Sequence, residues 1–169
     1  MVDLNPNQLH FDGESQEDSG LAGAGAVVKH GKDVYELGQF LDSATKSEAE
    51  YAALILGLNK ALELEIDELA IYGDSAIVMN HLSGEEEVDE PELMSLGQQA
   101  QKLVEQFMTT RLNHVKQGKN KHADWVARQV MESQENIDRQ ENLYNKYKQQ
   151  QKNQQQQQTQ NTKKSKKKK

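Results

Sequence analysis

The 169-residue sequence predicts an α/β fold: a five-stranded mixed sheet, with three antiparallel strands plus parallel strands, flanked by helices. Apolar segments and turn residues alternate across the first 41 residues, which favours an antiparallel meander. The apolar spacing then changes to the period of about 3.6 residues that is typical of a helix. Strand-like and helix-like segments alternate after that, which indicates parallel strands joined by helices.

Three strands are expected before residue 42. Leu9–Asp12 is a short apolar segment, and a polar loop follows it to Gly20. The second strand, residues 21–28, is rich in Gly and Ala, whose small side chains let another backbone or a ligand approach closely. Gly31 lies in a typical hairpin turn, so residues 34–41 should return antiparallel.

The first helix is predicted from an apolar stripe at i, i+4, i+7 and i+11, formed by Tyr51, Ile55, Leu58 and Leu62. Ser47 with Glu50 three residues later has the spelling of a capping box. This gives Glu50 a purely structural role as one alternative.

The second half of the domain alternates strands and helices. A fourth strand is expected within residues 65–72, and a second helix, capped by Ser75, runs to about residue 82. Pro91 suits the first turn of a third helix, which runs to about residue 108. A fifth strand at residues 111–115 and a last helix from about Lys121 complete the predicted order.

Composition divides the chain into a short tail (1–8), one domain (9–132) and a helical-to-disordered Gln/Lys-rich tail (133–169). Residues 1–132 hold 10 Lys and Arg against 24 Asp and Glu, whereas residues 133–169 hold 10 against 3. The absence of cysteine excludes disulfides and thiolate metal sites. No apolar run is long enough to span a bilayer, so we expect a cytoplasmic protein, or a nuclear one in a eukaryote.

Four acidic residues each stand beside an apolar segment: Asp12, Glu50, Asp74 and Asp124. Burying one charged group without a partner costs several kcal/mol. Four carboxylates in one place would also repel each other unless cations held them together. Divalent metal ions are therefore the expected partners.

Each of these acids stands in a short motif, and the four motifs follow one another along the chain. They are Asp12-Gly13 before a small-residue strand, Ala49-Glu50-Tyr51, Gly73-Asp74-Ser75, and His114 followed by Asn120 and Ala123-Asp124. From Leu9 to about Val130 the chain resembles type 1 ribonuclease H, and its spelling is closer to the plant and archaeal branch.

The resemblance implies an endoribonuclease that cuts the RNA strand of RNA/DNA hybrids with two Mg²⁺ or Mn²⁺ ions, leaving 5′-phosphate and 3′-hydroxyl ends. Asp12 would bridge both ions, Glu50 and Asp74 would hold one, and Asp124 the other. His114 would aid product or proton release. The implied substrate contacts are Gly13, Ser15, Thr45, Lys46, Ser47, Ser75 and Asn120.

Several positions depart from the family pattern. Lys46 and Ser47 replace paired asparagines, Ala76 replaces a glutamine, and Gln117 replaces an arginine. The acidic loop 85–90 stands where some members have a basic protrusion. Because each change weakens the grip on substrate, a catalytically weak nucleic-acid-binding module is the alternative function. Glu48 is the alternative ligand to Glu50, and His114 could equally be a packed or surface residue.

Lys163–Lys169 leaves three interpretations open: a solubility appendage, a nuclear localisation signal, or a tether to nucleic acid. We favour the tether, because an acidic domain needs another source of attraction to a hybrid. We expect a monomer without membrane contact. The chain starts just before the first strand, so we expect a free-standing protein rather than a domain of a reverse transcriptase or transposon protein.

Overall fold

The computed structural model describes residues 7–166, in which six strands and five α-helices form. The strands are β1 (Asn7–Ser15), β2 (Ala22–His30), β3 (Asp33–Leu41), β4 (Glu68–Gly73), β5 (Thr109–His114) and β6 (Ile137–Arg139). The helices are α1 (Lys46–Glu63), α2 (Ala76–Ser83), α3 (Pro91–Val104), α4 (Lys121–Ser133) and α5 (Leu143–Lys166), with a 3-10 turn at Gln117–Lys119. Parts of the predicted N-terminal tail and of Lys163–Lys169 lie outside the described residues.

The sheet has the strand order β5-β4-β1-β2-β3-β6. β1, β2 and β3 form an antiparallel meander, and β4 and β5 run parallel to β1. The predicted α/β class is therefore confirmed, but the predicted count of five strands is wrong. The sixth strand, β6, is only three residues long and pairs with β3 through Gly38 and Ile137, so no alternating pattern in the sequence announces it.

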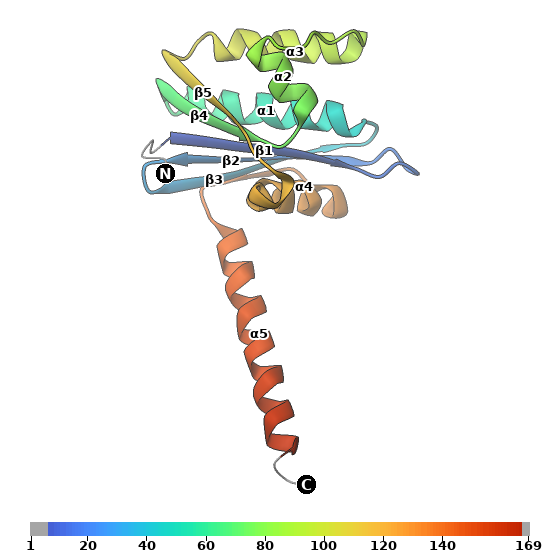
Figure 1. Ribbon diagram of the computed structural model, residues 1–169, viewed down its shortest axis with the longest axis vertical. Helices are drawn as coiled ribbons and strands as arrows, with labels where there is room; N and C mark the ends of the chain where they lie inside the picture. The colour runs from blue at the N-terminus through green and yellow to red at the C-terminus, as the bar shows by residue number, and fades with distance from the viewer. Residues whose placement is uncertain (1–6, 167–169) are drawn as a thin grey trace.

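Helices cover both faces of the sheet (Figure 1), with α1, α2 and α3 on one side and α4 on the other. The larger core lies under α1, where Leu9, Phe11, Tyr51 and Leu54 are buried. A smaller cluster under α4 includes Val27, Ala123 and Val126. The small residues of β2 serve the close approach expected of them: a Cβ at Gly25 would lie 2.6 Å from the Ala123 carbonyl oxygen.

The start of α1 differs from the prediction. Thr45 is the N-cap and forms the capping box with Glu48, so the predicted pairing of Ser47 with Glu50 is wrong. Glu48 and Glu50 lie two residues apart, and both the Thr45–Glu48 and the Ser47–Glu50 pairs have the capping-box pattern, so the pattern alone could not choose between them. As a result, the Glu50 side chain is free of any capping role. Similarly, α3 ends at Val104 rather than near residue 108, because Phe107 turns into the core.

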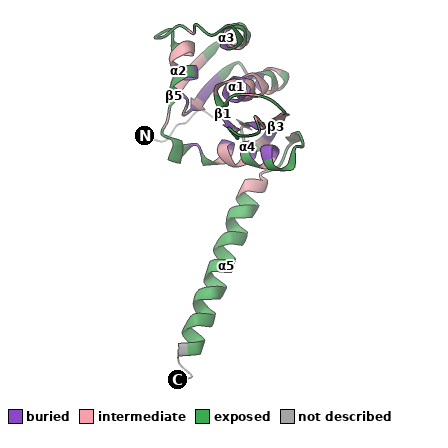
Figure 2. Ribbon diagram, turned by 90° about the vertical axis from the view of Figure 1, so that its right-hand side faces the viewer, coloured by how far each residue is buried: buried purple, intermediate pink, exposed green. Residues whose placement is uncertain are grey.

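α5 leaves the domain on the α4 side and extends away from it (Figure 1), and most of it is exposed (Figure 2). Only its first turns contact the domain: Tyr144 stacks on His122 at 4.8 Å between ring centroids, and Trp125 lies 5.6 Å from Tyr147. None of the described helices is long and apolar enough to cross a membrane. The boundary at residue 132 stays a prediction.

Candidate active site

Asp12 lies near the end of the central strand β1, on the face covered by α4. Its side chain is 2% exposed, and the backbone N–H of Gly13 donates to its Oδ1 atom at 2.9 Å. Gly13 faces the opposite way and lets α1 pack directly on the strand, since a Cβ there would lie 2.6 Å from the Ala49 carbonyl carbon. Asp12 thus places a buried carboxylate on the α4 face of the sheet, and Gly13 leaves room for α1 on the opposite face.

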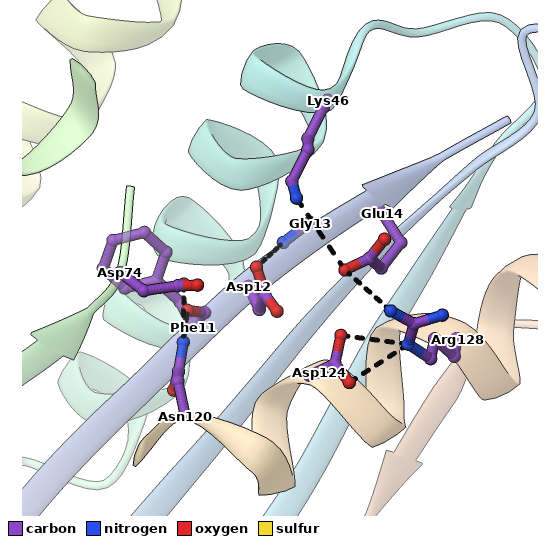
Figure 3. A network of polar contacts seen from close by, with 9 residues as sticks. All are labelled: Phe11, Asp12, Gly13, Glu14, Lys46, Asp74, Asn120, Asp124 and Arg128. Atoms are coloured by element: carbon purple, nitrogen blue, oxygen red, sulfur yellow. Dashed lines mark hydrogen bonds and ion pairs between the residues drawn. The ribbon is translucent and has the colours of Figure 1, made fainter. Parts of the chain in front are cut away.

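Asp74 follows β4, the parallel neighbour of β1, so the two acids meet at the same edge of the sheet. Asn120 joins them: its Nδ2 atom donates to the Phe11 carbonyl oxygen at 2.8 Å and to Asp74 Oδ1 at 3.0 Å. Figure 3 shows this amide between Asp74 and the β1 backbone. Because Asn120 is 2% exposed, it fixes Asp74 from within the protein.

Asp124 reaches the same place from the first turn of α4. The Nε atom of Arg128 donates to both of its carboxylate oxygens at 3.0 Å (Figure 3). Arg128 Nη2 also lies 3.6 Å from Glu14 Oε1, and Lys46 Nζ lies 4.0 Å from the same oxygen. Two cations therefore border the acids on the α1 and α4 sides.

Glu50 is buried on α1 and adjoins the group through Ser75, the N-cap of α2. Burial raises the pKa of Glu50, the hydrogen bond from Ser75 and the charge of Lys46 lower it, and Asp74 raises it further. The four predicted acids thus gather from β1, α1, the end of β4 and α4.

Burial and the repulsion of neighbouring acids disfavour the ionised forms of Asp12 and Glu14. Burial raises the pKa of Asp12 to about 8, and the charges of Asp74 and Glu14 act in the same direction. Burial also raises the pKa of Glu14, which shares a hydrogen bond with Asp124. Cations would reverse both effects, because a positive charge favours the ionised acid.

The donor set fits a hard divalent cation. Ligand oxygens of Asp12, Glu14 and Asp124 all lie within 4.8 Å of one another. Oε1 of Glu14 is buried and receives no hydrogen bond from the described residues, and its cationic neighbours Arg128 and Lys46 lie 3.6 and 4.0 Å away, so this oxygen can still accept a ligand. Oxygen-only ligands of this kind suit Mg²⁺ and Mn²⁺.

Comparisons with known proteins identify the family of the chain. Residues 10–130 match the protein family described as reverse transcriptase-like. The chain belongs to this family. Bifunctional protein Rv2228c of Mycobacterium tuberculosis is 38% identical over 128 residues, 74% of this chain but 35% of that protein. Ribonuclease HI of Halobacterium salinarum is 32% identical over 125 residues, 73% of this chain and 63% of that protein. The chain therefore spans less than two thirds of either relative's length.

Solved structures support the same assignment. The N-terminal ribonuclease H domain of Rv2228c, fused to maltose-binding protein, has a TM-score of 0.72 at 36% identity, covering 75% of this chain and 94% of that one. RNase H1 of Halobacterium salinarum has a TM-score of 0.71 at 31% identity, covering 75% and 98%. The resemblance to type 1 ribonuclease H is confirmed, and the described part of the chain holds a ribonuclease H-like domain.

Glu14 is the site residue of this domain that sequence reasoning missed. The prediction ended the first strand at Asp12 and placed Glu14 in a loop, but β1 continues to Ser15. In an extended strand, residues two apart face the same side, so Glu14 joins Asp12 under α4. The spacing Asp12, Glu14 was the signal that could have revealed it.

The other predicted residues surround the acids in different ways. The His114 ring is exposed, and its Nε2 atom lies 3.3 Å from the Asp74 carbonyl oxygen. Ser15 ends β1, while Thr45, Lys46 and Ser47 begin α1 on the same side of the site. By contrast, Ala76 and Gln117, the two positions that depart from the family pattern, are exposed.

Proposed function

We propose that this chain is a metal-dependent endoribonuclease that hydrolyses the RNA strand of RNA/DNA hybrids. The observation that carries the proposal is the buried Asp12 carboxylate, which lies among acids from other elements in a ribonuclease H-like domain. The relative in Halobacterium salinarum is named ribonuclease HI, which supports the same activity.

The acids would hold two divalent cations, either Mg²⁺ or Mn²⁺. Two such ions, when bound, would activate the attacking water and stabilise the leaving oxygen. The residues that would hold them are Asp12, Glu50, Asp74 and Asp124, and the geometry adds Glu14. Asn120 and Ser75 orient Asp74 and Glu50, so the ligands are held in place before any ion arrives.

Neighbouring side chains would handle the substrate and the proton. Lys46 stands at the start of α1 with an exposed side chain and can meet a backbone phosphate there. The exposed ring of His114, close to Asp74, can carry a proton between the site and water. Cleavage would leave 5′-phosphate and 3′-hydroxyl ends.

The test uses an RNA/DNA hybrid labelled on the RNA strand, with Mg²⁺ and separately with Mn²⁺. Wild type should cut the RNA strand, and Asp74→Asn should not. Asp138→Asn, which changes an exposed acid on β6, is the matched control and should cut like wild type. Intact RNA with wild type under both metals would refute the proposal.

A weak or inactive nucleic-acid-binding module is the second candidate. It is favoured by Ala76 and Gln117, which shorten two contacts, and by Arg128, which already occupies Asp124. Hybrid binding by wild type without cleavage under either metal would decide for this candidate.

The basic end of the chain is proposed to tether nucleic acid. Each Lys that neutralises a phosphate releases a counterion, so affinity should fall steeply with salt. Deleting residues 149–169 should raise the KM at low salt and flatten its salt dependence. Replacing Lys163, Lys164 and Lys166–Lys169 with Gln keeps the length and should give the same result; an unchanged salt profile in both variants would exclude the tether. The cytoplasmic location and the monomeric state stay predictions.

A further inference from the structure

A basic pocket adjoins the acidic site on the same face of the sheet. It has a volume of about 280 Å³, and its lining includes Lys29, Lys119, Lys121, His122, Tyr144 and Lys148. These residues come from β2, the 3-10 turn, α4 and α5. The pocket therefore forms only when the first turns of α5 are docked on the domain.

The lysines of this pocket lack acidic partners. Among residues 7–166, no carboxylate forms an ion pair with Lys29, Lys119, Lys121 or Lys148. Burial, and then the charge of Lys148, lower the pKa of Lys29. Lysines grouped without ion-pair partners of their own favour the binding of an anion.

Lys148 is held in place by the docking of α5. The buried carboxylate of Glu36 accepts the backbone N–H groups of Leu143 and Tyr144, each at 3.2 Å. The Tyr144 ring stacks on His122, and Lys148 Nζ lies 4.7 Å from the centre of the same ring. The amine thus stands over the pocket on a fixed helix turn, although the rest of α5 extends into solvent (Figure 1).

The pocket and the acidic site share a wall. Asn120 lines the pocket and also donates to Asp74. His10 lines it too, two residues before Asp12 on the same face of β1. A nucleic-acid strand with one phosphate at the acids would therefore bring a neighbouring phosphate to the lysines.

We propose that this pocket binds a backbone phosphate of the nucleic acid beside the scissile bond, and that Lys148 makes α5 a part of the substrate-binding surface. The inference rests on the proposed function for the identity of the nucleic acid. The anion chemistry of the pocket is independent of cleavage.

The first experiment measures hybrid binding in EDTA by fluorescence anisotropy across a salt series. In Lys29→Gln/Lys148→Gln the plot of log K against log salt should be less steep by about 0.9, because the contact with one phosphate is lost. The matched control Lys32→Gln/Lys102→Gln removes two exposed lysines from outside the pocket and should keep the wild-type slope. Equal slopes in both variants would overturn the inference even if wild type cuts hybrids.

The second experiment measures thermal unfolding with inorganic pyrophosphate, in EDTA and at constant ionic strength. Pyrophosphate should raise the Tm of wild type and of the control, but not that of Lys29→Gln/Lys148→Gln. The same Tm increase in all three proteins, or none in wild type, would overturn the pocket whatever the cleavage assay shows. If pyrophosphate raises the Tm of wild type and of the control but not that of Lys29→Gln/Lys148→Gln, while all three proteins bind the hybrid equally, nucleic acid would be rejected as the ligand of the pocket. If both experiments give the expected results but wild type does not cut the hybrid in the cleavage assay, only the proposed nuclease activity would be rejected.

Discussion

Glu36 on β3 and Asp12 on β1 are both buried beneath α4, but their surroundings are opposite. Glu36 receives hydrogen bonds from His122 at 2.6 Å, from Arg139 at 2.8 Å and from two backbone N–H groups of α5. Burial alone would raise the pKa of Glu36, but these partners outweigh it and hold the pKa below its usual value. Asp12 receives one N–H bond, faces other acids, and has a pKa raised to about 8.

The difference teaches how to tell a structural acid from a functional one. Glu36 is satisfied by groups of the chain itself, so it ties β3, α4 and α5 together. The ionised form of Asp12 has no cation of the chain to balance it, and a protein tolerates such a group where an added cation can supply that charge. Asp12 and Glu36 are both almost fully buried, so their partners decide whether the pKa is raised or lowered.

The largest expected effect is on catalysis. Asp12→Asn keeps the shape of the side chain but removes its charge, so the RNA strand of a hybrid should be cut at least about 10⁴-fold more slowly. Steady-state cleavage of a labelled hybrid in Mg²⁺ measures this. A loss below tenfold would mean that Asp12 is not a metal ligand in the reaction.

The next effect is on folding, at the other acid. Glu36→Gln leaves Arg139 and His122 without their carboxylate, and should lower the free energy of unfolding by about 3–5 kcal/mol. Chemical denaturation measures this, with the exposed Glu135→Gln as the matched control. A loss under about 1 kcal/mol would show that Glu36 and Asp12 do not differ as described.

The third effect is a gain in stability, opposite to the loss expected for Glu36→Gln. Asp12 has a folded-state pKa of about 8 against an ordinary value of 3.8, so the unfolded chain releases the proton first as the pH rises. In metal-free buffer the free energy of unfolding should therefore fall between about pH 4 and pH 8. Asp12→Asn removes this penalty and should be about 1–3 kcal/mol more stable than wild type at pH 8. Equal stability of the two proteins at pH 8, with Asp33→Asn as the exposed control, would argue against a strained Asp12.

The smallest effect concerns Arg128, whose side chain is 49% exposed. Arg128→Gln removes a cation that competes for Asp124 and Glu14, so Mg²⁺ should bind about 2- to 5-fold more tightly. Calorimetric titration measures the affinity. Weaker binding in the variant would instead show that Arg128 holds Asp124 in its ligand position.

The sequence predicted the order of the first five strands because each has an apolar segment bounded by turn residues, as in the meander before residue 42. It also singled out Asp12, Glu50, Asp74 and Asp124, since acids beside apolar segments are unusual. The roles of these four residues stay predictions until metal binding is measured.

Long-range partners could not be predicted. Glu36 meets His122 and Arg139, which lie 86 and 103 residues further along the chain, so no local pattern reveals a buried ion pair. The choice of Thr45 as N-cap depended on where the loop before α1 ends, and two overlapping motifs fitted equally well. Glu14 escaped because strand ends are the least certain part of such a prediction.

Counting bound Mn²⁺ by electron paramagnetic resonance tests the contrast between the two acids most directly, because it needs no substrate. At neutral pH the wild-type protein should bind Mn²⁺, and the affinity should fall at least tenfold in Asp12→Asn but not in Asp33→Asn. Unchanged Mn²⁺ binding in Asp12→Asn would contradict the account, since the buried charge at Asp12 would then have no cation to meet it.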